Sequence, residues 1–309
     1  MAWSAEIDEI IAGDLAAALT YTTPARGVVI TPMAPLGVRD PEAGTITLTT
    51  SLGLWRKLER IRANPAVAVA FHARDHGDSN RSDFVLAQGT ASFSTRPDRA
   101  WLESIRPQWD HFLGPPAGGP VGRWLDVYYY QRVAITVDVR RVVAWSSLDC
   151  AGEPRVFGEA LPDPPPPQSP PRNGAGPRTD SDRLVAEAGR LPHALLGWSG
   201  ADGLPMAVAV EATGSGPDGA VLAVPQSVRP DGGRRAGLTA HRFWPRMIGQ
   251  EQRIYTGWLD VDADGRAVYA PHTRAGYRLP ASKPAFVIGS GLVTRRGIRE
   301  ARKRGLAPD

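Results

Sequence analysis

Two cations stand at the start of a predicted helix in the stretch TTSLGLWRKLERIRANP, residues 49–65. Arg56 and Lys57 follow two hydroxyl residues, Thr50 and Ser51, that can cap the helix. The first turn of a helix exposes unpaired N–H groups and the positive end of the helix dipole, so cations there are disfavoured unless an anion is bound. A guanidinium, an ammonium and hydroxyl groups at a helix start suit a phosphomonoester. The alternative is that the cations are the solvated face of an amphipathic helix.

A second pair of cations, Arg234-Arg235, lies in the segment GGRRAGLTAHRF. Aligning Lys57 with Arg234 needs no gap through the next seven residues, so this segment takes the place of the first helix. A later glycine also recurs, as Gly89 in the first half and Gly257 in the second. We therefore predict a diverged internal duplication. The alternative is a chance similarity of two β-rich halves.

A third group of residues, in YAPHTRAGYRLP, contains His272, Arg274 and Tyr277. These candidates would line a substrate pocket, with His272 as a proton donor or substrate anchor, and a surface loop is the alternative. His72 and His76 in FHARDHGDSNR suggest a metal site, but their spacing fits no helix face and no second ligand cluster is present. We expect no metal. Motifs for ATP hydrolysis, Rossmann dehydrogenases and serine hydrolases are missing from the sequence.

Both parts of the chain are predicted to be mostly β, because short β-branched runs alternate with Pro, Gly and Asp. The strands expected in the first part are LAAALTYT, ARGVVITPM, GTITLTTS, AVAVAFHA, FVLAQGTASF and RVAITVDVRRVVAW. Those expected in the second part include ALLGWSGADGLPMAVAV, AVLAVP and RIYTGWLDVD. Helices are expected near the N-terminus, at 52–63, and at 96–105 with Ser94 or Thr95 as the cap.

A proline-rich segment separates the two parts. Residues 162–177 read PDPPPPQSPPRNGAGP, in which half of the residues are proline. We expect a stiff, extended linker in which nothing packs. The predicted division is a first domain at 1–150, the linker at 151–179 and a second domain at 180–309.

The formal net charge of +4 comes from the C-terminus, because the last eighteen residues hold six cations and two anions. A basic C-terminal helix is able to contact nucleic acid or a membrane, but such ends are more often solvated, and we expect neither partner. These cations are Arg295, Arg296, Arg299, Arg302, Lys303 and Arg304.

The single cysteine, Cys150, excludes an internal disulfide and a thiolate metal cluster, and we expect it in the core or at a strand end. Acidic residues near the N-terminus stand where a signal peptide would be basic, and no apolar run reaches eighteen residues. The expected location is the cytoplasm.

Four elements of the first half, taken in order, resemble the pyridoxamine 5'-phosphate oxidase-like split barrels, a superfamily of FMN-binding and deazaflavin-dependent oxidoreductases. They are the Thr-Pro strand VVITPM, the strand TITLTTS, the basic helix RKLERIRANP followed by AVAVAF, and the strand FVLAQGTASF. The resemblance implies a six-stranded barrel that dimerises with a flavin at each interface. For this chain it implies a mostly β fold of two tandem split β-barrels, antiparallel and six-stranded with short helices, packed as an intrachain pseudo-dimer.

The resemblance also implies cofactor ligands in the first half. Arg56 and Lys57 would hold the cofactor phosphate, and Ser51 and Thr50 would donate hydroxyls to it. The segment Thr31-Pro32-Met33 would run beside the isoalloxazine ring.

In the second half, Arg234 and Arg235 would be the corresponding ligands. This half departs from the family pattern, because Gly233 stands where the first half has an arginine. Its site is either rebuilt around Ser227 and Arg229 or empty. We expect one working site per chain, with phosphate ligands from the first half and ring contacts from the second.

We therefore predict an FMN-dependent oxidoreductase that transfers a hydride to or from a small organic substrate bound between the halves. FMN is favoured because Arg56-Lys57 with Ser51 resembles the FMN-binding members, and a deazaflavin coenzyme is the alternative because it also carries phosphate. A second hypothesis is a protein that holds flavin or haem without turnover. The chain would be a monomeric pseudo-dimer or a homodimer.

Overall fold

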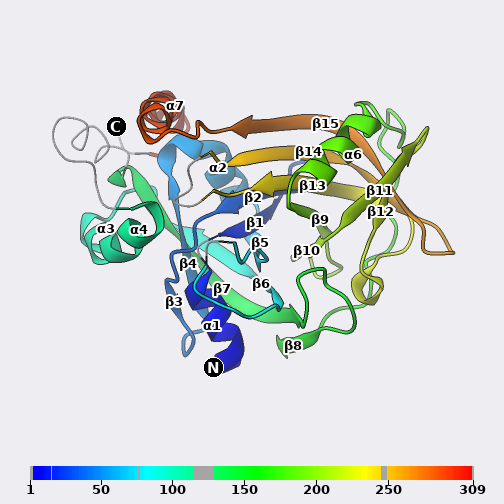
Figure 1. Cartoon of the computed structure of the whole chain (residues 1–309), viewed down its shortest axis with the longest axis horizontal. Coiled ribbons are helices and arrows are strands. Elements are labelled where there is room, and N and C mark those ends of the chain that lie inside the picture. Colours follow the sequence, from blue (N-terminus) through cyan, green and yellow to red (C-terminus); the bar gives the residue numbers. More distant parts are fainter. Residues whose placement is uncertain (1–2, 15, 76, 115–128, 245–248, 308–309) are drawn as a thin grey trace.

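Two antiparallel sheets form the protein, as seen in a computed structural model that describes residues 3–14, 16–75, 77–114, 129–244 and 249–307 (Figure 1). The first sheet has the strand order β2-β1-β5-β6-β7-β4-β3, and β8 pairs with β7. The second has the order β10-β9-β13-β14-β15-β12-β11, which is the same order position by position. The predicted mostly β class of two tandem barrel halves is confirmed. The additional strands β3 and β8 in the first half and β11 in the second extend the six main strands of each half.

All six strands predicted in the first half are present. Their inward side chains alternate with outward ones, so that Val133, Ile135 and Val137 of β7 enter the first core. The bounds are β1 Ala17–Thr22, β2 Val28–Met33, β3 Arg39–Asp40, β4 Thr45–Ser51, β5 Ala66–Phe71, β6 Phe84–Phe93, β7 Arg132–Trp145 and β8 Arg155–Gly158.

The second sheet repeats the strand order of the first and differs in the segment that joins its third and fourth main strands along the chain. The bounds are β9 His193–Ser199, β10 Pro205–Ala209, β11 Glu211–Gly216, β12 Gly219–Ala223, β13 Arg234–Arg242, β14 Glu251–Val261 and β15 Ala267–Arg278. The first half passes from β4 to β5 through a helix, whereas the second passes from β12 to β13 through one short turn.

Gly89 and Gly257 occupy the same place in the two sheets. Each lies where the register shifts by a β-bulge, between Gln88 and Gly89 in the first sheet and between Thr256 and Gly257 in the second. A Cβ atom would stand 2.0 Å from a backbone oxygen at Gly89 and 2.2 Å at Gly257, so only glycine fits. The equivalence of these two glycines is confirmed.

The equivalence of GGRRAGLTAHRF with the first helix is wrong. Residues 234–242 form β13, which pairs with β9 and β14 and is therefore the counterpart of β5. The strand is buried on both faces, and a Cβ atom at Gly237 would stand 2.3 Å from the carbonyl oxygen of Val28 in the first half. Pairing along both edges and close packing against β2 fix the extended conformation.

The helices are few and short, apart from the last one. The bounds are α1 Ala5–Gly13, η1 Leu52–Leu54, α2 Trp55–Ala63, α3 Arg99–Ser104, α4 Arg106–Leu113, α6 Ser181–Arg190, η2 Gln226–Val228 and α7 Lys283–Lys303. The helix predicted at 52–63 is present as η1 and α2. The helix predicted at 96–105 begins later, because Asp98, not Ser94 or Thr95, accepts the capping hydrogen bond, from Trp101 N. None of the helices described combines the length and apolar character needed to cross a bilayer.

The segment at 151–179 does not lie free of the rest. It contains β8, and its backbone binds the second half: Gln168 N donates to Gly233 O over 2.7 Å, and Arg178 N donates to Pro271 O over 2.8 Å. The expectation that nothing in it packs is wrong, because the few residues between the prolines keep their N–H donors.

Two large cores hold the fold together. The first fills the interior of the first half and takes in Ile298, Ala301 and Leu306 from the C-terminal end of the chain. The second joins residues of both halves, so the two sheets pack against one another. At this junction Thr239 Oγ1 and Gln252 Nε2 both donate to the carbonyl oxygen of Ile30, at 2.8 and 3.1 Å.

Candidate functional site

The end of β4 and the start of α2 bring the predicted hydroxyl residues to one corner of the first half. Ser51 is buried and caps η1, its Oγ accepting a hydrogen bond from Gly53 N over 3.1 Å. Thr50 is also buried, and its Oγ1 has no hydrogen-bond partner among the described residues. Because side chains alternate along a strand, Thr50 faces the barrel interior with Leu48, whereas Ser51 faces the opposite side.

Lys57 lies in the first turn of α2 and is only 7% exposed. Burial, and then the charge of Arg132, lower its pKa from 10.5 to about 7. Among the described residues no carboxylate or hydrogen bond acts against this shift. A buried ammonium without a counter-ion is unstable, so this corner favours an anion.

Arg132 is a further cation of the corner that the sequence did not reveal. It stands opposite Ser51 in the register of β7 with β4, and it is buried. Its guanidinium donates to Thr49 Oγ1 and to Thr49 O, at 3.0 and 2.8 Å, and lies 4.3 Å from the ring centre of Trp109. Arg132 reaches this corner because β7 pairs with β4, and such a long-range strand pairing cannot be read from a single sequence.

Arg56 is exposed, in contrast to Lys57. Its guanidinium lies 5.3 Å from the ring centre of Trp55 on the outer side of α2. The two cations predicted to act together therefore differ in environment, with Lys57 inside the corner and Arg56 at its rim.

The C-terminal helix α7 covers this corner, and the contact is made backbone to backbone. A Cβ atom at Gly53 would stand 2.8 Å from Thr294 Cα, and one at Gly297 would stand 2.0 Å from Gly53 O. The start of η1 is therefore enclosed by a helix from the opposite end of the chain.

The segment Thr31-Pro32-Met33 forms the end of β2. Thr31 Oγ1 donates weakly to Leu19 O over 3.4 Å, and the Met33 side chain belongs to the first core. Only Thr31 of the three is partly exposed, so a ring contact along this strand stays a prediction.

Arg234 and Arg235 hold the proline-rich segment against the second half. Arg234 is buried on β13, and its Nη2 donates to Pro165 O over 3.0 Å and to Asp231 O over 2.5 Å. Arg235 donates through its backbone N to Gln168 Oε1 over 3.1 Å. Neither arginine lies at the start of a helix, which was the geometry that suggested a phosphate site. Their role as phosphate ligands stays a prediction.

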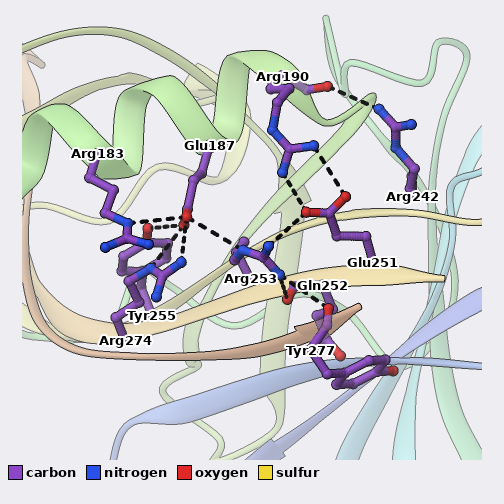
Figure 2. A network of polar contacts seen from close by, with 10 residues as sticks. All are labelled: Arg183, Glu187, Arg190, Arg242, Glu251, Gln252, Arg253, Tyr255, Arg274 and Tyr277. Atoms are coloured by element: carbon purple, nitrogen blue, oxygen red, sulfur yellow. Dashed lines mark hydrogen bonds and ion pairs between the residues drawn. The ribbon is translucent and has the colours of Figure 1, made fainter. Parts of the chain in front are cut away.

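Arg274 belongs to a network that ties α6 to β14 and β15 (Figure 2). Its Nε donates to Glu187 Oε2 over 3.0 Å, and Tyr255 Oη donates to the same oxygen over 2.5 Å. Burial acts to raise the pKa of Glu187, but hydrogen bonds led by that of Arg274 outweigh burial and lower the pKa to about 2. The network therefore stabilises the packing of α6.

His272, Arg274 and Tyr277 all lie on β15, so the alternative of a surface loop is wrong. His272 makes its contact outside the network, whereas Tyr277 joins the network through its backbone, its carbonyl oxygen accepting from Arg253 Nη1 over 3.1 Å (Figure 2). His272 Nε2 hydrogen-bonds to Ala175 O over 3.1 Å, in the proline-rich segment, and the Tyr277 side chain is exposed. The structure does not bring His272, Arg274 and Tyr277 to one pocket among the described residues, and their catalytic role stays a prediction.

A cavity of about 820 Å³ lies at η2, which occupies in the second half the position of η1 and α2. Three carboxylates, those of Asp149, Glu153 and Glu211, line it, and none of its described lining residues is a cation. Its electrostatics disfavour a phosphate, so the two halves differ at this position. Its wall is formed by residues 149–153, 209–211 and 223–227.

Three histidines from both halves meet at the junction of the sheets. His72 Nε2 and His241 Nε2 are 2.8 Å apart, and the ring centre of His193 lies 5.5 and 5.3 Å from those of His72 and His241. His193 Nε2 also contacts Asp75 Oδ2 over 2.8 Å. No group of ligands among the described residues has the arrangement of a metal site, and His76 lies outside the described residues. The buried position expected for Cys150 is confirmed.

The chain matches no protein-family model and no curated protein. Among solved structures it is similar to a conserved hypothetical protein from Mycobacterium tuberculosis, with 20% identity, a TM-score of 0.36, and coverage of 47% of this chain and 86% of that one. An F420 reductase is similar with 20% identity and a TM-score of 0.33 over 44% of this chain and 94% of that one. A protein of the pyridoxinephosphate oxidase family from Clostridium acetobutylicum is similar with 15% identity and a TM-score of 0.35 over 50% and 92%. Each of these structures covers about half of this chain, and the likeness concerns the fold alone.

Proposed function

We propose that the protein is a flavin-dependent oxidoreductase that binds the phosphate of its cofactor at the start of α2. The observation that supports the proposal is Lys57, a buried ammonium whose lowered pKa finds no compensating carboxylate among the described residues. A phosphate bound there would restore the charged ammonium, and the N–H groups at the helix start favour an anion as well.

The residues at this corner fit a phosphomonoester. Lys57 and Arg132 would supply charge, the Ser51 hydroxyl would donate from the capping position, and Arg56 would close the rim. Arg132 is held in place by Thr49, so it is ordered before an anion arrives. Bound flavin would supply hydride transfer, and the protein would orient it and exclude water.

FMN remains the favoured cofactor and a deazaflavin coenzyme the alternative, because both carry phosphate. The similar structures include an F420 reductase and an FMN-binding protein, so they are compatible with either cofactor. The proposed reaction is the transfer of a hydride to or from a small organic substrate. The proposal also keeps the division into domains at 1–150 and 180–309.

The proposal predicts that Lys57→Ala weakens FMN binding at least tenfold, which is the order of a lost charge-assisted hydrogen bond. Flavin fluorescence quenching during titration of the cofactor-free protein measures this affinity. Lys303→Ala is the matched control, because Lys303 is an exposed lysine on α7, and it should bind as the wild type does. Unchanged affinity in a folded Lys57→Ala protein would refute the phosphate assignment.

A separate titration with the deazaflavin coenzyme distinguishes the two cofactors. The visible spectrum of the purified protein, and mass spectrometry of what heat releases from it, identify any bound species. A protein that binds neither compound is not a flavin-dependent oxidoreductase of this kind.

A further inference from the structure

The outer side of α7 and α2 carries a dense group of exposed basic residues. We call it the basic face. Eight exposed cations stand against the two partly exposed carboxylates of Glu59 and Glu300. The exposed cations are Arg56, Arg62, Arg295, Arg296, Arg299, Arg302, Lys303 and Arg304.

Packing of the C-terminal segment directs the cations of α7 outward. Ile298, Ala301 and Leu306 are buried in the first core, so the opposite side of the helix faces solvent. Figure 1 shows α7 at one edge of the molecule, beside α2. The C-terminal helix is therefore a fixed part of the fold and not a trailing end.

The cations of the two helices form one continuous surface. The guanidinium groups of Arg56 and Arg304 lie 5.3 and 4.0 Å from the same ring, that of Trp55. Arg62 donates to the carbonyl oxygens of Arg304 and Gly305, each over 3.3 Å. Arg304 also pairs with Glu59 over 2.8 Å.

Exposed apolar side chains gather beside the same helix. Leu54 is 49% exposed and Val293 is 61% exposed, and each is adjacent to the crossing of Gly53 with Thr294. Trp244 and Tyr277, also exposed, lie in or next to the segments that lead to α7. Four of the five large hydrophobic side chains that are exposed in the described chain thus lie at α7 or at its approach.

We propose that the basic face binds the surface of an anionic lipid bilayer. Arginines and a lysine would attract anionic headgroups, and the protruding leucine, valine and aromatic side chains would enter the interfacial region. Nucleic acid would satisfy the charges but offers nothing to the aliphatic side chains, so the lipid surface is the better partner. The contact lies on the outer surface, and of the residues proposed to hold the cofactor phosphate it includes Arg56 alone.

Sedimentation with vesicles tests the proposal. The full chain should bind vesicles of phosphatidylglycerol and phosphatidylcholine at low salt and should not bind vesicles of phosphatidylcholine alone. Arg296→Glu combined with Arg299→Glu should weaken binding at least tenfold, since each basic residue near the surface contributes appreciably. Leu54→Ser combined with Val293→Ser should weaken it severalfold at unchanged charge.

The matched control combines Arg172→Glu with Arg266→Glu, which changes the charge equally in the proline-rich segment and in the turn before β15, both away from α7. It should bind vesicles as the wild type does, and circular dichroism should show that all three variants are folded. Absence of binding to phosphatidylglycerol vesicles, or an equal loss in the control, would overturn the proposal. Binding to a DNA duplex without binding to vesicles would assign the face to nucleic acid and would also overturn it.

Discussion

At the scale of the residue, Lys57 is the group whose environment is most at odds with its chemistry. An ammonium removed from water loses its hydration, and the charge of Arg132 adds repulsion. Such a group persists in a fold either at a cost to stability or because a ligand supplies the missing anion. Replacing Lys57 by an uncharged residue should therefore raise the stability of the cofactor-free protein and lower its affinity for the cofactor.

Lys57→Met should stabilise the cofactor-free protein by about 2 kcal/mol or more at pH 6, because one pKa unit corresponds to about 1.4 kcal/mol. The folded pKa of Lys57 is about 7 and its ordinary value is 10.5. Between these values the unfolded chain keeps a proton that the folded chain releases, so wild-type stability rises with pH and the advantage of Lys57→Met shrinks toward pH 9.5. Urea unfolding at both pH values measures this. A variant less stable than the wild type at pH 6 would show that the ammonium has a partner after all.

Part of this corner was predictable from sequence and part was not. Ser51 and Lys57 follow from the local pattern of a capped helix with early cations. Arg132 required the pairing of β7 with β4, in which Arg132 stands opposite Ser51, a residue far away in sequence. The opposite orientations of Thr50 and Ser51 follow from strand alternation only once the interior side of β4 is known.

At the scale of the element, the crossing of η1 and α7 depends on two glycines. The backbones approach too closely for a Cβ atom on either side, since one on Gly297 would stand 2.0 Å from Gly53 O. Helices cross this closely only through residues without side chains. The enclosure of the candidate phosphate site and the direction of the basic face both depend on this crossing.

Gly297→Ala should therefore destabilise the protein by about 1–3 kcal/mol, the usual result of forcing atoms into a packed contact. Gly189→Ala in α6 is the matched control, because a Cβ atom there meets nothing within 4 Å. It should stabilise by up to about 1 kcal/mol through helix propensity. Thermal unfolding of both variants measures the difference, and equal stabilisation by both would show that α7 does not pack tightly on η1.

Elements with local signals were predicted well. The six main strands of the first half, the strands β9, β10, β12 and β14 of the second, and the helix at 52–63 follow from periodicity and caps, whereas β11, β13 and β15 were not predicted. GGRRAGLTAHRF was misassigned because its cation pair was aligned with that of the first helix, although Ala236, Leu238 and Ala240 alternate as in a strand. Its strand pairing with β9 and β14 is set by distant partners. The docking of α7 on the first half was not predictable, since its contacts are more than two hundred residues away in sequence.

At the scale of the whole molecule, the junction of the two sheets contains a buried histidine pair. His72 follows β5 in the first half and His241 lies on β13 in the second. Burial lowers the pKa of both rings, which keeps them neutral near pH 7. His72 Nδ1 donates to Ala70 O over 3.1 Å, so in the neutral ring His72 Nε2 accepts the hydrogen bond from His241 Nε2, and this bond links the halves.

Acid should weaken the protein through this pair. Burial, followed by the charge of His193, lowers the pKa of His72 to about 3, and burial followed by His72 lowers the pKa of His241 well below 6.5. As the pH falls below 6.5, the unfolded chain takes up protons that the folded pair refuses, so the free energy of unfolding decreases. Between pH 7.5 and 5.5 we expect a loss of about 2–3 kcal/mol from the two rings, at about 1.4 kcal/mol per pH unit for each.

His72→Gln combined with His241→Gln keeps a hydrogen-bonded pair that does not titrate, and urea unfolding of this variant should lose most of the pH dependence. His111→Gln, at an exposed histidine, should retain it. If the free energy of unfolding of the double variant falls in acid as steeply as that of the wild type, the histidine pair is not the source of the pH dependence. If the dependence disappears, a pair of neutral imidazoles accounts for the acid sensitivity of the contact between the halves, because charging either ring would place an unpaired cation between two packed sheets.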